Sequence, residues 1–282
     1  MSTDRTGSED VGDARELVED HSVGSVDLTR WRTPPGRALA DGVESASRRV
    51  GTRTALILTV VIGGVVAIVL AFVASRIYDA VVDHDGVAGL DRPILTEAMR
   101  LRSPILDAVV TGYTDIAGPI GMPIIAVTAL LILSLRRRSA TPAILIAAAG
   151  LGSLGMTIVG KDVIDRDRPP LADAVPPYEL SPSFPSGHTL NAVVVIGMIA
   201  YLLILRRRSM HARVLIVTAA AVFALTVGLS RVFLGHHWFT DVLAGWVLGI
   251  AWLALLITAH RGYITARRSL ASHRPKDSHA PH

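Results

Sequence analysis

Long apolar runs alternate with short polar connectors between residues 55 and 259. Each run is close to the roughly 20 residues that a helix needs to cross the hydrocarbon core of a bilayer. We therefore predict an all-α polytopic membrane protein in which six transmembrane helices form a bundle. The predicted helices cover residues 55–78, 116–135, 142–160, 188–205, 214–229 and 242–259.

The two ends of the chain lack this pattern. Residues 1–50 are polar, with mixed acids and arginines, several Gly and Ser, and no period that would form a core. The first apolar run begins too late for a signal peptide, so these residues are predicted to form a mostly disordered cytoplasmic tail. A six-helix membrane domain is then predicted over residues 51–262, followed by a basic cytoplasmic tail over residues 263–282.

Arginine clusters mark one side of the predicted bundle. Triplets join the second helix to the third and the fourth helix to the fifth, and further arginines flank the first and sixth helices. With six spans, all the clusters fall on one side, which the positive-inside rule makes cytoplasmic. We therefore predict a multi-pass protein of the cell (plasma) membrane with both termini in the cytoplasm. The clusters are Arg136-Arg137-Arg138, Arg206-Arg207-Arg208, Arg48 with Arg49 and Arg53, and Arg261 with Arg267 and Arg268.

Three connections then lie on the opposite, extracytoplasmic side, at residues 79–115, 161–187 and 230–241. In the first of them, Ile94-Leu95 and Ala98-Met99 form a weak amphipathic pattern. A helix that lies along the membrane interface and a plain connector both fit this pattern.

Glycines are concentrated in the predicted third helix, at Gly150, Gly152, Gly155 and Gly160. Small residues let neighbouring helices approach closely in a membrane. We therefore predict that this helix lies inside the bundle and packs through its glycines.

Composition supports the membrane class and excludes several functions. Half of the residues are hydrophobic, 18% are charged and the mean hydropathy is +0.45. The absence of cysteine excludes a disulfide, a thiol nucleophile, a thiolate metal site and prenyl or palmitoyl anchors. Nucleic-acid binding is not expected, because the basic residues flank apolar runs instead of covering one soluble face. The sequence indicates no oligomeric state.

Candidate chemistry is densest between Ser230 and Asp241. His237 and Asp241 are four residues apart, so they share a face if the last helix starts near them. A carboxylate on one imidazole nitrogen leaves the other nitrogen basic, as a nucleophile or general base requires. Arg231 adds a planar cation suited to a phosphate. An interfacial His and Asp that anchor a helix end, with Arg231 snorkelling, explain this segment equally well.

Two further groups lie at the ends of other predicted helices. Lys161 is one of only two lysines in the chain, and it precedes Arg168 in the connection after the third helix. Ser186-Gly187-His188 stands where the fourth helix begins, and exposed N–H groups at a helix start bind anions. Each group has an ordinary alternative, such as snorkelling of Lys161 or a simple turn and cap. Three cations and two histidines on one side fit a phosphoryl group.

These three groups resemble the three-part signature of the type 2 phosphatidic acid phosphatase (PAP2) superfamily. The matching parts run from Lys161 over six residues to Arg168-Pro169, then Pro185-Ser186-Gly187-His188, then Ser230-Arg231 with five residues to His237 and three to Asp241. No position is missing, and the resemblance covers roughly residues 55–259. It implies that the membrane domain is a six-helix phosphatase, with outward-facing catalytic loops, that uses no metal and no other cofactor.

The resemblance also implies a role for each matching residue. His237 would attack phosphorus and form a phosphohistidine, Asp241 would orient His237, and His188 would protonate the leaving group and then activate water. The non-bridging oxygens would be held by Lys161, Arg168, Ser186, the backbone N–H of Gly187, and Arg231.

Several neighbouring charged residues and one histidine fall outside the signature. The motif spacing favours His237 over His236, which is interpreted as a neighbour or an indirect donor. Arg166 misses the Arg-Pro position and is left out of the phosphate site. Asp162, Asp165 and Asp167 are interpreted as charge balance among cations and not as a metal site.

The predicted function is metal-independent hydrolysis of a lipid phosphate or polyprenyl diphosphate at the outer membrane face through a phosphohistidine. The substrate class includes undecaprenyl or decaprenyl diphosphate, phosphatidylglycerol phosphate, phosphatidic acid and polyprenyl-phosphoryl sugar phosphates. Two alternatives stay open: a lipid-phosphate phosphotransferase, and a transporter or flippase that binds lipid phosphate without hydrolysis. Beyond the substrate, only membrane lipids are expected as partners.

Overall fold

The computed structural model describes residues 86–272, with side chains to residue 267. It also describes Phe72 and positions 22–23, 25–31, 33–34, 36–38 and 41–42. The first predicted span, 55–78, therefore lies outside the described residues except for Phe72.

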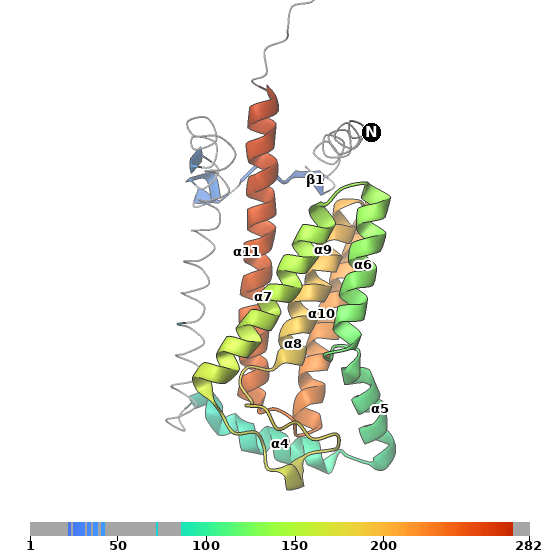
Figure 1. Ribbon diagram of the computed structural model, residues 1–282, viewed down its shortest axis with the longest axis vertical. Coiled ribbons are helices and arrows are strands. Elements are labelled where there is room, and N and C mark those ends of the chain that lie inside the picture. The colour runs from blue at the N-terminus through green and yellow to red at the C-terminus, as the bar shows by residue number, and fades with distance from the viewer. Residues whose placement is uncertain are drawn as a thin grey trace, which may run out of the picture.

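The described part of the chain is a bundle of long helices (Figure 1). Four stretches are long and apolar enough to cross a membrane: Thr141–Ile164, Gly187–Leu205, Met210–Phe233 and Phe239–Arg267. The elements are β1 (Ser22–Val23), β2 (Val26–Asp27), η1 (Gly86–Leu90), α4 (Asp91–Arg100), α5 (Pro104–Asp115), α6 (Gly121–Arg137), α7 (Thr141–Ile164), η2 (Leu171–Asp173), α8 (Gly187–Asn191), η3 (Ala192–Ile196), α9 (Gly197–Leu205), α10 (Met210–Phe233) and α11 (Phe239–Ser272). The polytopic helical class is confirmed, whereas the count of six spans stays a prediction.

The helix ends differ from the predicted boundaries. Helices α7 and α10 are both 24 residues long, so they extend beyond the apolar runs at 142–160 and 214–229. An apolar run stops at the first charged side chain, but the helical backbone continues through it. Lys161 and Arg231 therefore lie on the last turns of α7 and α10, fixed to rigid helix instead of loop. Helix α6 has 17 residues and covers most of the predicted second span.

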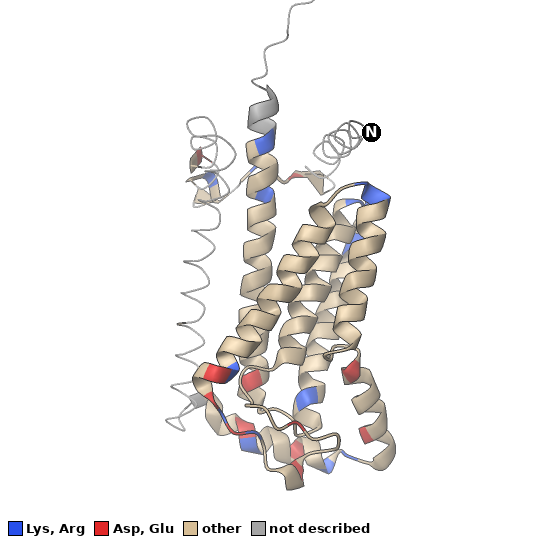
Figure 2. Cartoon of the chain, in the orientation of Figure 1, with Lys and Arg blue, Asp and Glu red and all other residues tan. Residues whose placement is uncertain are grey.

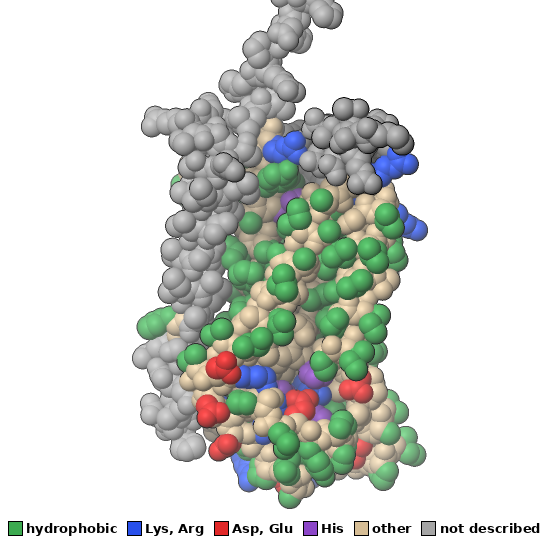
Figure 3. Space-filling view, in the orientation of Figure 1, with side chains coloured by type: hydrophobic (Ala, Val, Ile, Leu, Met, Phe, Trp, Pro, Cys, Tyr) green, Lys and Arg blue, Asp and Glu red, His purple; other side chains and the backbone are tan. Residues whose placement is uncertain are grey.

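The bundle has two chemically different ends (Figure 2). The arginine-rich connections α6–α7 and α9–α10 lie at one end. The long 165–186 connection, the 234–238 connection and helix α4 lie at the other end, where acids and bases gather. Apolar side chains cover the surface between them, as expected for a lipid-facing belt (Figure 3). We call the two ends the arginine end and the site end.

Helix α4 covers the site end and packs against α10 and α11 (Figure 1). Its inward residues are Asp91 and Leu95, which are 5% and 1% exposed. Arg92 and Glu97 face outward. Helix α4 is therefore amphipathic, as the sequence indicates, but its apolar face packs onto protein. Helix α5 begins at Pro104 after Ser103, whose side chain accepts the N–H of Leu106.

Glycines bring selected elements into close contact. A Cβ added to Gly160 would lie 2.5 Å from Pro185, so α7 packs directly against the loop that precedes α8. A Cβ added to Gly245 would lie 3.0 Å from Thr189, so α11 and α8 are similarly close. The prediction holds for Gly160 and for Gly152, where an added Cβ would overlap the Trp252 ring. It is wrong for Gly150 and Gly155, because added Cβ atoms there would meet nothing within 4 Å.

A short antiparallel hairpin precedes the bundle in sequence, with Ser22 opposite Asp27 and Val23 opposite Val26. It packs near the arginine end of the last helix. Arg261 Nε donates to the carbonyl of Leu28 at 2.9 Å, and its guanidinium lies 4.4 Å from the centroid of the Trp31 ring. The predicted division of the chain into two tails and one membrane domain stays a prediction.

Candidate active site

Two loops meet at the site end and are joined by backbone hydrogen bonds. The 165–186 loop leaves α7 at Asp165, whose φ of 41° turns the chain sharply back. Val175 N–H then donates to the Leu234 carbonyl at 2.8 Å, and Ser186 N–H donates to the Asp241 carbonyl at 3.2 Å. Residues from α7, α8, α10 and α11 are thereby held around one point.

His237 lies at the centre of this region and is only 1% exposed. Arg168 Nη1 donates to His237 Nε2 at 3.3 Å. Because a guanidinium can only donate, Nε2 is the acceptor, and the neutral ring carries its proton on Nδ1. On that side, Nδ1 lies 3.4 Å from Ser183 Oγ and 3.6 Å from Asp241 Oδ2. The bare nitrogen therefore faces the cations, as a nucleophile for a phosphoryl group requires.

Asp241 is completely buried and accepts several hydrogen bonds. Its Oδ2 accepts from Ser183 Oγ at 2.5 Å and from the backbone N–H of Trp238 at 2.9 Å. The second bond resembles the acidic half of a capping box at the start of α11. The predicted closeness of His237 and Asp241 is observed, but Ser183 mediates their hydrogen bonding.

The cations of the site are two arginines and one lysine, and one glutamate pairs with both arginines. Arg231, 1% exposed, donates from Nη2 to Glu179 Oε1, and Arg168 Nη2 lies 2.8 Å from Glu179 Oε2. Lys161 Nζ donates to Ser181 Oγ at 2.7 Å and to the Pro182 carbonyl at 2.5 Å. One carboxylate therefore bridges two of the predicted phosphate-binding cations.

Burial and the neighbouring charges shift the pKa values of Glu179 and His237. Burial opposes ionisation of Glu179, yet the charges of Arg231 and Arg168 outweigh it and lower its pKa to about 2. Burial, together with Arg168 and Arg231, holds the pKa of His237 well below its ordinary value. Glu179 is therefore a carboxylate and His237 a neutral imidazole near neutral pH.

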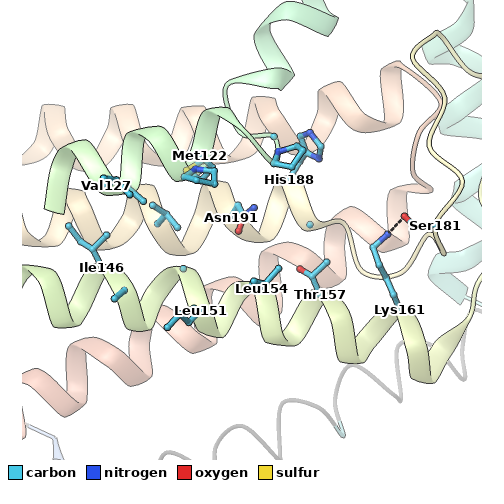
Figure 4. Close-up of a pocket in the computed structure, with 18 of the residues that line it drawn as sticks. Met122, Val127, Ile146, Leu151, Leu154, Thr157, Lys161, Ser181, His188 and Asn191 are labelled. Atoms are coloured by element: carbon cyan, nitrogen blue, oxygen red, sulfur yellow. Dashed lines mark hydrogen bonds between the residues drawn. The ribbon is translucent and has the colours of Figure 1, made fainter. Parts of the chain in front are cut away.

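A cavity of about 940 Å³ extends from these residues along the bundle. His188, His237, Lys161 and Gly187 line its polar end. Figure 4 shows His188 and Lys161 at one end of the pocket, with apolar residues of α6 and α7 lining the rest. We call this cavity the groove. Its labelled apolar residues are Met122, Val127, Ile146, Leu151 and Leu154.

The predicted site residues come together, but three of the predicted phosphate-binding residues, Arg168, Ser186 and Arg231, do not line the groove. Lys161, His188, His237 and Gly187 line the groove, while Arg168 contacts His237 and Arg231 contacts Glu179. Ser186 is buried and does not line the groove, and its hydroxyl accepts from Thr189 Oγ1 at 2.9 Å.

His236 Nε2–H donates to the Val175 carbonyl at 2.7 Å, in agreement with its interpretation as a neighbour. The bond joins the 234–238 connection to the long loop a second time. His236 therefore helps to hold the loop.

Four residues of this region were not predicted from the sequence: Asp91, Arg166, Glu179 and Ser183. Ser183 lies only two residues before the predicted Pro185 turn, and Arg166 lies between the predicted Lys161 and Arg168. Their positions in the motif segments were therefore a usable signal. Asp91 belongs to another connection, and nothing in its sequence neighbourhood indicates contact with α11. Among the described residues, no group of three or more His, Cys, Asp or Glu is placed to hold a metal.

Comparison with known proteins agrees with this architecture. The sequence profile of the PAP2 superfamily matches residues 140–264. Phosphatidylglycerophosphatase B of Bacillus subtilis (strain 168) is 35% identical over 182 residues, which is 64% of this chain and 87% of that protein. The crystal structure of a transmembrane PAP2-type phosphatidylglycerolphosphate phosphatase from Bacillus subtilis superposes with a TM-score of 0.60 at 27% identity, covering 75% of this chain and 98% of that one. The predicted family is confirmed, and the chain belongs to the PAP2 superfamily of membrane phosphatases.

Proposed function

We propose that this protein hydrolyses a lipid phosphate, without a metal ion, through a phosphohistidine on His237. The observation that carries the proposal is the groove, which joins a histidine–cation cluster to an apolar channel between helices. Its volume of about 940 Å³ lies near the upper end of the range typical of ligand pockets. A phosphate head group fits the polar end, and an apolar chain fits the remainder.

The chemistry of the proposed reaction follows from the atoms that face the groove. His237 Nε2 attacks phosphorus, and the bond from phosphorus to the lipid oxygen breaks. His188 gives its proton to that oxygen, and the lipid alcohol leaves. His188 then takes a proton from water, whose oxygen attacks the phosphohistidine and releases inorganic phosphate. Phosphoryl transfer needs mainly positioning and neutralisation of oxygen charge, which Lys161, Arg168 and Arg231 supply.

The proposed substrate is a lipid phosphate, with phosphatidylglycerol phosphate as the first compound to test. Both relatives are named for that activity, and one of them superposes over most of this chain. A polyprenyl diphosphate is the second compound to test, because a groove open along the bundle also admits a long isoprenoid chain.

The proposed orientation puts the site end outside the cell. Its support is the charge difference between the two ends, because the arginine end carries the connections that the positive-inside rule assigns to the cytoplasm. The protein is accordingly proposed to span the plasma membrane with both termini inside.

The test is release of inorganic phosphate by purified protein from both lipids in the presence of EDTA. The wild type is expected to be active, and His237→Ala is expected to lose at least about 10⁴-fold in kcat, as enzymes do when their nucleophile is removed. Full activity of His237→Ala, or full dependence on a divalent cation, would overturn the mechanism. Transfer of labelled phosphate to an alcohol instead of water would identify a phosphotransferase, and lipid movement without phosphate release would identify a transporter.

A further inference from the structure

Arg166 lies outside the groove, between two buried carboxylates. Its Nη1 donates to Asp241 Oδ1 at 2.5 Å, and its Nη2 donates to Asp91 Oδ2 at 2.7 Å. The side chains of Arg166, Asp91 and Asp241 are 14%, 7% and 0% exposed. Three ionisable side chains from three separate segments therefore form one buried cluster.

Asp91 extends this cluster to the first turn of α11. Its Oδ1 accepts the backbone N–H of Thr240 at 2.9 Å, and its Oδ2 accepts Thr240 Oγ1 at 2.7 Å. Arg166 Nη1 also donates to Thr240 Oγ1 at 2.7 Å. Helix α4 thus fixes both the backbone next to Asp241 and, through Arg166, one oxygen of its side chain.

Burial of such a cluster costs free energy unless each charged group has an oppositely charged partner in good hydrogen-bonding geometry. Asp241 uses Oδ2 for Ser183 and Trp238, so Oδ1 would have no partner without Arg166. An arginine fork can bond two carboxylates at once in a fixed plane, which a lysine ammonium cannot do. Arg166 therefore fixes the rotation of the Asp241 carboxylate and places a cation beside it.

We propose that Arg166 and Asp91 are positioning residues for catalysis. They hold the Asp241 carboxylate so that its other oxygen, through Ser183, fixes the tautomer and the orientation of His237. This inference rests on the proposed function, in which His237 Nε2 is the nucleophile. Because Arg166 and Asp91 bond to Asp241 and Thr240, whereas Arg168 bonds to Nε2 of His237, the pair acts on the rate of phosphoryl transfer and not on the binding of phosphate.

The test compares Arg166→Met, Arg166→Lys and Asp91→Asn with Arg168→Lys, a matched change two residues away that alters a cation contacting His237. For each purified protein, kcat, KM and the inhibition constant of inorganic phosphate are measured. Arg166→Met and Asp91→Asn are expected to lower kcat by about 100-fold, as small misplacements of a reacting group do. Their KM and phosphate inhibition are expected to stay within about twofold of wild type, whereas Arg168→Lys weakens both.

Two further comparisons separate positioning from general stability. Arg166→Lys keeps the charge and is expected to recover part of the lost kcat. The double variant Arg166→Met/Asp91→Asn is expected to lose no more than Arg166→Met alone, because both changes remove the same constraint on Asp241.

The inference is overturned if kcat is unchanged in folded Arg166→Met and Asp91→Asn, or if KM and phosphate inhibition change in place of kcat. It is also overturned if all three single variants fail to fold and bind no phosphate, since the cluster would then be structural only. An active His237→Ala would instead disprove the proposed function, whatever the Arg166 variants show.

Discussion

The two ends of the bundle use the same side chain, arginine, in opposite ways. At the site end, Arg231, Arg166 and Arg168 are largely withdrawn from solvent and paired with carboxylates. At the arginine end, Arg207 and Arg208 are exposed. There Arg137 donates to the carbonyl of Leu202 in the last turn of α9, and Arg213 Nε donates to the Arg207 carbonyl in the connection that follows.

The difference shows that the burial and pairing of an arginine near a membrane surface indicate its role. An exposed arginine on a connector costs little free energy to place, because its charge stays in water. A buried arginine is tolerated only with a partner, and removal of either member leaves an uncompensated charge. Burial and pairing, rather than the number of arginines, thus distinguish the site end of this protein from its arginine end.

Among the experiments that compare the two ends, the largest effect is expected when one arginine at each end is replaced by glutamine in separate variants. Arg231→Gln removes a buried cation from the proposed phosphate site and is expected to lower kcat/KM by about 10²- to 10³-fold, as loss of one transition-state donor does. Arg207→Gln, an exposed change at the arginine end, is expected to stay within about twofold of wild type. Phosphate release by both purified variants checks the pair, and equal losses would erase the distinction between the ends.

A second experiment tests the groove, using two glycines on one helix. Gly150 lines the groove and Gly155 does not, although neither has a neighbour within 4 Å of an added Cβ. Gly150→Leu is expected to lower kcat/KM for a long-chain lipid phosphate by about 10-fold, because it fills space meant for the chain. Activity on a short, water-soluble phosphate ester is expected to be unchanged in both variants. A loss in Gly155→Leu as large as that in Gly150→Leu would contradict a chain in the groove.

A third experiment uses pH to test the cations around His237. Burial, Arg168 and Arg231 lower the pKa of His237, while Glu179 opposes them and Lys161 acts with them. The wild-type imidazole is therefore still neutral when the pH falls through 6.5, and the acid limb of kcat/KM is expected below that value. In Arg168→Met the pKa of His237 is lowered less, so the acid limb of kcat/KM is expected at higher pH. A limb that does not move would mean that Arg168 does not act on His237.

How much of this region the sequence predicts depends on where each residue lies. His188, His237, Lys161 and Arg231 were predictable because each stands at the end of an apolar run, where a charged group near a membrane is conspicuous. Because successive helices of the bundle run in opposite directions, these four residues are expected to meet at one end. The helix bundle itself followed from the length of the apolar runs.

The remaining partners were not predictable in the same way. Ser183 stands close to the Pro185 motif in sequence, but its contacts, like those of Glu179, depend on a loop whose path is set by tertiary hydrogen bonds, such as that from Ser183 N–H to the Arg166 carbonyl. Loop sequence has no period from which such a path can be calculated. In the sequence, Asp91 cannot be distinguished from an exposed acid in the first turn of a helix. Its burial becomes visible only in the packing of α4 onto α11.

The smallest expected effect concerns Glu179, the one acid in the cationic cluster. Its carboxylate bridges Arg168 and Arg231, where the oxygens of a phosphate are proposed to bind. Its lowered pKa of about 2 keeps it ionised throughout the working range of the enzyme. It must therefore compete with phosphate for the same two guanidinium groups.

Glu179→Gln removes this competitor and is expected to lower the inhibition constant of inorganic phosphate by about 3- to 10-fold, because more of the protein is then ready to bind. Glu97→Gln is the matched control, since Glu97 is an exposed acid that pairs with Arg100 on the outer face of α4. The inhibition constant is measured at several pH values above 5, where Glu179 stays charged in the wild type. A weaker affinity for phosphate in Glu179→Gln would show that the carboxylate holds the two arginines in place for the substrate instead of competing with it.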